Sequence, residues 1–247
     1  MKIRLLLIFC IALAAMPAWS ARPGDERTVK PVQFAQGKTS TEIQSSIKGY
    51  HFIDYQVKAG AGQKITISLK ASNGANYFNL LPPDSQDVAM AQGELLANHF
   101  SGMLPDEGVY TIRVYLMRSA ARRNETSRFT LSVEVTGKPL PAVSSKIDAV
   151  LPGTRFHAKT TVKCAPQYSQ SKMCDAVVIR RGHDGTATVV VSWGTLEKRR
   201  ILFVRDKPVV ADVPQPFTST KDKMDHHVLV FEGGERFEIP DALVTGG

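Results

Sequence analysis

Hydrophobic and polar residues alternate in two runs on either side of an arginine-rich segment. In the first run Tyr110, Ile112, Val114 and Leu116 share one face of a predicted strand. The second run begins at Phe129 and continues the alternation through Leu131, Val133 and Val135. The intervening segment breaks the alternation and carries Arg118, Arg122, Arg123 and Arg128. The pattern predicts two strands joined as a hairpin, with the arginines in a projecting loop.

Similar short alternating runs, separated by Gly, Pro and Asp, occur from about residue 50 to the end of the chain, with almost no helical periodicity. This pattern predicts an all-β protein whose first part is a β-sandwich. The segment 136–146 contains Pro and Ser and predicts a linker, so we expect a β-sandwich domain over 21–137 and a second small β-rich domain over 138–247. Within the second domain, glycines at 182–185 and 233–234 predict two hairpins.

The N-terminus has the features of a secretory signal peptide. Lys2 and Arg4 precede an apolar run that is followed by small residues, and cleavage is expected after Ser20, so that residues 1–20 are removed. No later stretch is long and apolar enough to span a bilayer. We therefore expect a soluble protein exported to the periplasm, with no integral membrane segment.

Two cysteines, Cys164 and Cys174, remain after Cys10 is lost with the signal peptide. An even number of cysteines in an oxidising compartment favours one disulfide between them, and two unlinked thiols are the alternative. No metal site is predicted. Two cysteines do not complete a four-ligand shell, and neither the histidine at 183 nor the pair at 226–227 has a spacing that supplies the rest.

The net charge of +8 falls to +6 when Lys2 and Arg4 are removed, and the cations are scattered among acids without a nucleic-acid-binding signature. We expect the basic charge of an exported protein to meet acidic proteins, anionic lipid or cell-wall polymer. No nucleophile elbow, zinc-protease motif or phosphate-binding loop is present, so neither an enzyme nor a cofactor is predicted.

The arginine segment has two interpretations from residue type alone. It is either a solvated tip whose charges prevent strand-edge aggregation or a contact surface for carboxylates, which the planar guanidinium group suits better than lysine does. Several motifs bear on this choice: "KGY" at 48–50, "GQK" at 62–64, "LPDEGVY" at 104–110, and the spacing of Arg118, Ala121 and Arg122 before an Asn.

Over residues 45–135 these motifs resemble the periplasmic inhibitors of goose-type lysozyme, small β-sandwiches related to prepeptidase C-terminal domains. The resemblance implies that Tyr50, Arg118 and Arg122 bind a goose-type lysozyme, with the arginines entering the active-site cleft and pairing with its carboxylates. The second domain lies outside the resemblance. The alternatives are an exported cell-wall or adhesion module without inhibitory activity and, more weakly, an enzyme in the second domain.

Overall fold

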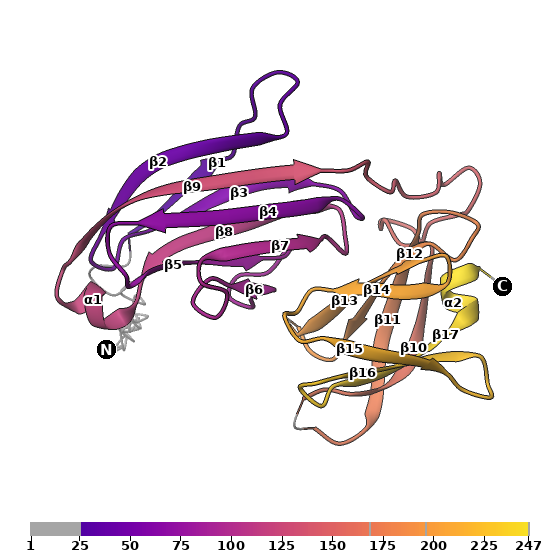
Figure 1. Ribbon diagram of the computed structural model, residues 1–247. Helices are drawn as coiled ribbons and strands as arrows, with labels where there is room; N and C mark the ends of the chain where they lie inside the picture. The colour runs from indigo at the N-terminus through magenta and orange to yellow at the C-terminus, as the bar shows by residue number, and fades with distance from the viewer. Residues whose placement is uncertain (1–25, 168, 196, 247) are drawn as a thin grey trace, which may run out of the picture.

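A computed structural model describes residues 26–167, 169–195 and 197–246 and contains three β-sheets (Figure 1). The expected signal peptide lies outside these residues. The β3–β8 sheet contains, in spatial order, β1 (Arg27–Pro31), β3 (Phe52–Ala59), β8 (Gly108–Leu116), β5 (Asn76–Leu81) and β6 (Ala91–Gln92). The β4–β9 sheet contains β2 (Ser40–Lys48), β9 (Thr126–Thr136), β4 (Lys64–Ala71) and β7 (His99–Met103). The all-β prediction is confirmed.

The two N-terminal sheets form a sandwich because one face of each strand is apolar. In β8 the predicted inner residues Tyr110, Ile112 and Val114 are fully buried, and in β9 Leu131 and Val133 face them from the other layer. Alternate side chains of a strand point to opposite sides, so each sheet buries one face and exposes the other. The predicted alternation on both sides of the arginine segment is therefore confirmed.

The predicted hairpin between these two strands is wrong. Strand β8 pairs with β3 and β5, whereas β9 pairs with β2 and β4 in the other sheet. Alternation shows which face of a strand is buried but does not identify its hydrogen-bonding neighbour. The chain between β8 and β9 crosses from one layer to the other at the end of the sandwich, so the arginine segment caps that end.

The C-terminal sheet is a third, antiparallel sheet of eight strands. In spatial order these are β14 (Lys207–Ala211), β13 (Lys198–Val204), β12 (Ala187–Ser192), β11 (Lys172–Arg180), β10 (Ala158–Ala165), β17 (Arg236–Pro240), β16 (His226–Phe231) and β15 (Phe217–Lys221). The predicted hairpins β11–β12 and β16–β17 are present. The sheet curls around its own apolar core, against which the short helix α2 (Asp241–Thr245) packs.

The predicted disulfide between Cys164 and Cys174 is confirmed. It joins β10 to β11 across a sequence separation of 10 residues. Both cysteines are buried in the C-terminal core. None of the described helices is long and apolar enough to cross a membrane.

Buried charges hold the C-terminal sheet against the sandwich. Asp106, in the turn before β8, is fully buried and accepts hydrogen bonds from Arg155 at 2.5 Å and from Arg181 at 2.9 Å. Arg200 lies 3.5 Å from the same carboxylate and 3.0 Å from Asp212. Because ionised groups are costly to bury without partners, this network favours one orientation of the two parts.

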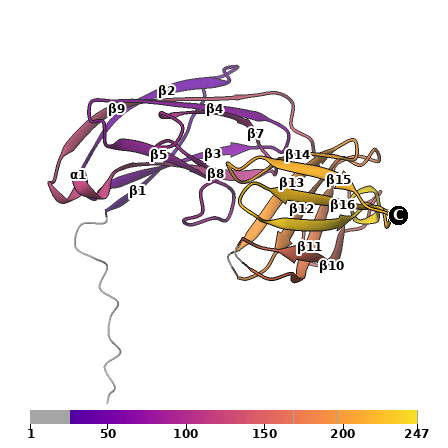
Figure 2. The same cartoon turned by 60° about the horizontal axis from the view of Figure 1, so that its bottom comes forward.

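Hydrogen bonds to backbone carbonyl oxygens continue this interface. The hydroxyl of Thr188 in β12 donates to the carbonyl oxygen of Pro105 at 2.7 Å, and Arg181 donates to the carbonyl oxygen of Leu140 at 2.8 Å. Figures 1 and 2 both show the C-terminal sheet at one end of the sandwich and the β8–β9 crossing at the other. The arginine segment is therefore far from this interface. Independent folding of 21–137 and 138–247 stays a prediction.

Candidate functional site at the β8–β9 crossing

The chain between β8 and β9 contains one turn of helix, α1 (Arg118–Arg122), where the sequence had predicted an irregular loop. Ala120 and Ala121 are almost fully buried and belong to the sandwich core. Their small side chains let the helix backbone sit directly on the open end of the sandwich. A helical segment this short gives no repeat of its apolar positions, which is why periodicity did not reveal it.

The helix ends in a Schellman motif. Asn124 has a φ of 55°, and its N–H donates to the carbonyl oxygen of Ala121 at 2.9 Å, while the N–H of Glu125 donates to that of Ala120 at 3.2 Å. A left-handed residue after the last turn satisfies carbonyls that would otherwise lack partners, and Asn tolerates this conformation better than most residues. The Asn that follows the arginines therefore stops the helix after one turn.

Arg118 and Arg122 share one face of α1. Residues four apart lie one above the other on a helix, so the two side chains are neighbours, and both are exposed whereas Ala120 and Ala121 between them are buried. Neither arginine forms a hydrogen bond or ion pair with any residue in the described part of the chain. Their guanidinium groups are therefore available to an external partner.

Arg123 is engaged within the protein. Its Nε donates to Glu125 at 2.6 Å, and the other carboxylate oxygen of Glu125 accepts a hydrogen bond from Asn73 at 2.7 Å. The hydrogen bonds from Asn73 and Arg123 hold the pKa of Glu125 below its ordinary value. These contacts attach the end of α1 to the turn between β4 and β5.

Tyr50 lies in the turn between β2 and β3, which packs directly against the chain after α1. The N–H of Gly49 donates to the carbonyl oxygen of Glu125 at 2.9 Å. Gly49 has a φ of +58°, and a Cβ at this position would lie 2.8 Å from Asn124 Oδ1. Tyr50 follows immediately and is 40% exposed. The three predicted site residues therefore belong to two segments in contact at one end of the sandwich.

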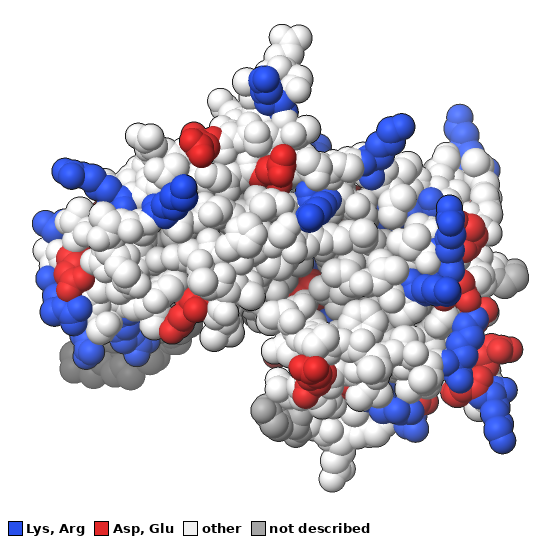
Figure 3. All heavy atoms as spheres, viewed as in Figure 1, with Lys and Arg blue, Asp and Glu red and all other residues white. Residues whose placement is uncertain are grey.

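This end of the molecule is rich in cations (Figure 3). Arg128, predicted in the loop, lies instead within β9, where it pairs with Ser46 and is exposed. Lys48, at the end of β2, and Lys70, in β4, are exposed on neighbouring strands. Arg128 was predicted in the loop because Phe129 is the first apolar residue of the alternating run. Strand β9 begins before Phe129, and its inner face already includes the buried but polar Ser127.

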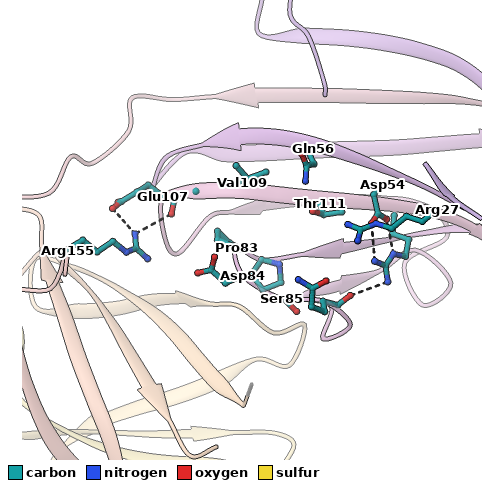
Figure 4. A pocket seen from close by; sticks show the side chains of 14 residues that line it. Arg27, Asp54, Gln56, Pro83, Asp84, Ser85, Glu107, Val109, Thr111 and Arg155 are labelled. Carbon is teal, nitrogen blue, oxygen red and sulfur yellow. Dashed lines mark hydrogen bonds and ion pairs between the residues drawn. The ribbon is translucent and has the colours of Figure 1, made fainter. Parts of the chain in front are cut away.

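A polar hollow of about 550 Å³ lies elsewhere, on the outer face of the β3–β8 sheet beside the C-terminal sheet (Figure 4). Its charged groups largely pair with one another. Asp54 is held by Arg27 at 2.8 Å and by Arg113 at 2.8 Å, and Glu107 accepts a hydrogen bond from Arg155 at 2.9 Å. These pairs satisfy the charges that a ligand or reacting group would otherwise meet, so we take the α1 end as the candidate site.

No protein-family model matches the sequence. A curated protein, "Inhibitor of g-type lysozyme" from Escherichia coli (strain K12), is 30% identical over 137 residues, which make up 99% of that protein and 55% of this chain. This chain belongs to the family of inhibitors of g-type lysozyme. Nearly half of it therefore has no counterpart in that inhibitor.

Solved structures of g-type lysozyme inhibitors are also similar to this chain. The periplasmic inhibitor of Aeromonas hydrophila is 35% identical, with a TM-score of 0.43 over 45% of this chain and 99% of its own. The periplasmic inhibitor of Salmonella Typhimurium is 27% identical, with a TM-score of 0.37 over 44% of this chain and 98% of its own. The resemblance predicted from the sequence motifs is confirmed by the identity to the Escherichia coli inhibitor.

Proposed function

We propose that this protein inhibits a goose-type lysozyme by inserting the α1 end of its sandwich into the enzyme's active-site cleft. The observation that carries the proposal is the pair Arg118 and Arg122: two exposed guanidinium groups on one helical face, with no partner in the described chain. The family membership supports it, because the relative from Escherichia coli is named for inhibition of g-type lysozyme.

The chemistry of the target suits these groups. Glycoside hydrolases act through a pair of carboxylic acids that flank the scissile bond. Arg118 and Arg122 pair with such carboxylates through charge-assisted hydrogen bonds, and exclusion of water strengthens the pairs. Tyr50 packs its ring at the rim of the cleft and offers its hydroxyl for a hydrogen bond. Inhibition by blocking the cleft needs no chemical reaction from the inhibitor, so the proposed function is not enzymatic.

We place this activity in the periplasm. The relatives from Aeromonas hydrophila and Salmonella Typhimurium are described as periplasmic, and the N-terminal pattern predicts export. A periplasmic inhibitor meets lysozyme where the enzyme reaches peptidoglycan.

The proposal is tested by measuring peptidoglycan hydrolysis by a goose-type lysozyme with increasing amounts of the mature chain. Inhibition that reaches completion at about one inhibitor per enzyme supports it. A parallel sedimentation assay with peptidoglycan alone separates inhibition from the alternative of a cell-wall module. Co-sedimentation with the polymer, together with undiminished enzyme activity, would favour that alternative.

A further inference from the structure

A second group of ionisable side chains converges in the C-terminal sheet, away from the α1 end. His227, on β16, has its Nε2 atom 3.0 Å from Oδ1 of Asp206 and 3.0 Å from Oδ1 of Asp241. Asp206 lies in the turn between β13 and β14, and Asp241 begins α2. The side chain of His227 is 3% exposed and packs edge to face on Phe203, with ring centroids 5.1 Å apart. The imidazole is therefore held in place.

The charges of this group require a cation. An imidazole Nε2 carries a single N–H, yet two carboxylates approach it. Lys221, at the end of the edge strand β15, supplies positive charge, with its Nζ 2.6 Å from Asp206 and 3.0 Å from Asp241. Its side chain is 42% exposed, so it can turn outward to water without crossing the core.

We propose that His227, Asp206 and Asp241 bind a divalent transition metal of the zinc class, which displaces the ammonium group of Lys221. One nitrogen and two carboxylate oxygens suit zinc or cobalt, whereas magnesium and calcium prefer oxygen ligands alone. Zinc bonds of about 2.0–2.2 Å place tetrahedral ligand atoms about 3.3–3.6 Å apart, so the two separations of 3.0 Å between Nε2 and the carboxylate oxygens need to widen by only a few tenths of an ångström.

The surroundings fit a site with an open position. The carboxylates of Asp206 and Asp241 are 31% and 29% exposed, so water can reach the side away from His227. When the metal binds, Nε2 gives up its proton and the ammonium of Lys221 moves away. The ion then joins three separate elements, the β13–β14 turn, β16 and α2.

The adjacent His226 provides an internal comparison. It points to the opposite face of β16, where Asp222 and Glu238 are its acidic neighbours. Asp222 accepts the backbone N–H groups of Met224 and His226, and Glu238 is paired with Lys163 at 3.3 Å. His226 itself lies 3.2 Å from Asp222 through its Nδ1 atom. Since the two acids are committed to separate partners, and no lysine or arginine in the described part of the chain bridges them, His226 serves as a control.

Metal binding is measured on the tag-free mature chain by zinc calorimetry and by the visible absorption of added cobalt. The unmodified chain is expected to bind one ion. His227→Gln and Asp241→Asn should each weaken binding by about tenfold or more, since each removes one of three ligands. Lys221→Gln should tighten binding by about tenfold because it removes a competing cation. His226→Gln should leave the affinity unchanged.

If His227, Asp206, Asp241 and Lys221 form only an ion-pair cluster that binds no metal, these measurements give a different result. Lys221→Gln then weakens the fold without creating zinc affinity, and zinc shifts neither its Tm nor that of the unmodified chain. Either that outcome or zinc binding that His227→Gln and Asp241→Asn leave unaltered overturns the proposal. Circular dichroism verifies the fold of each variant, and Asp241→Asn decides the matter if His227→Gln does not fold. The inference is independent of lysozyme inhibition.

Discussion

The backbone N–H of Gly49 donates a hydrogen bond to the carbonyl oxygen of Glu125, and this contact joins the turn that carries Tyr50 to the end of α1. It brings together residues far apart in sequence at one end of the sandwich. The pair also gives a way to disturb the arrangement of the candidate site without changing any of the side chains proposed to touch the enzyme.

Gly49→Ala should weaken lysozyme inhibition beyond what its loss of folding stability accounts for. The left-handed conformation of Gly49, with a φ of +58°, costs a residue with a Cβ about 1–2 kcal/mol, and the new atom would lie 2.8 Å from Asn124. The matched control is Gly37→Ala, at a φ of +72° with nothing within 4 Å. Urea unfolding should show a lower free energy of unfolding for both variants, whereas only Gly49→Ala should inhibit the lysozyme less than the parent does. Equal inhibition by the two would contradict the role given to this contact.

Glu125 should titrate below the ordinary glutamate pKa of about 4.3, because Asn73 and Arg123 stabilise its ionised form. With a folded-state pKa below the unfolded value, its contribution to stability is present above the unfolded pKa and is lost as the pH falls through the folded one. NMR titration of the side-chain carboxyl group measures this. Asn73→Ala should raise the pKa, and a pKa already at or above the ordinary value in the parent would refute the assignment.

Loss of the Asp106 carboxylate should destabilise the protein strongly. Asp106→Ala leaves the fully buried Arg181 short of a partner, and breaking a buried pair costs about 3 kcal/mol or more. Asp87→Ala is the control, since Asp87 is 88% exposed and pairs at 3.3 Å with Arg113, where a surface pair contributes about 0–1 kcal/mol. Both are measured by denaturant unfolding. Equal effects would show that the buried network does not hold the interface.

Replacement of both cysteines, Cys164→Ser with Cys174→Ser, should lower the free energy of unfolding by roughly 2–3 kcal/mol on the chain-entropy account of a ten-residue separation. Because the disulfide lies in the C-terminal sheet, far from α1, the oxidised and double-serine proteins should inhibit alike when both are folded. Reduced inhibition by the folded double variant would instead connect the C-terminal sheet to the site.

Sequence patterns predicted the strands well where one face is buried. Alternation identified the inner residues of β8 and β9, such as Ile112 and Leu131, because burial of one face imposes a period of two. Alternation does not choose a partner, so the assignment of these strands to one hairpin failed. The single turn of α1 was missed because Ala120 and Ala121 alone form its buried face.

Arginines posed a different difficulty. Arg181 and Arg200 are buried at the interface, whereas Arg118 and Arg122 are exposed, yet residue type is the same in all four. Their roles depend on acids that come close only when the chain has folded. The group around His227 could not be predicted for the same reason, since its two aspartates come from a turn and a helix distant in sequence.

Inhibition by the double variant Arg118→Ala with Arg122→Ala tests the central proposal most directly. The matched control, Lys207→Ala with Lys223→Ala, removes the same charge from exposed positions in the C-terminal part. Dose–response curves against a goose-type lysozyme should show a loss of about 100-fold or more for the arginine variant, at about 1.4 kcal/mol per tenfold change. The control should inhibit as the parent does, and both should unfold within about 0.5 kcal/mol of it, as exposed substitutions usually do. An arginine variant that inhibits as strongly as the parent, or a parent that inhibits no goose-type enzyme, would contradict the account.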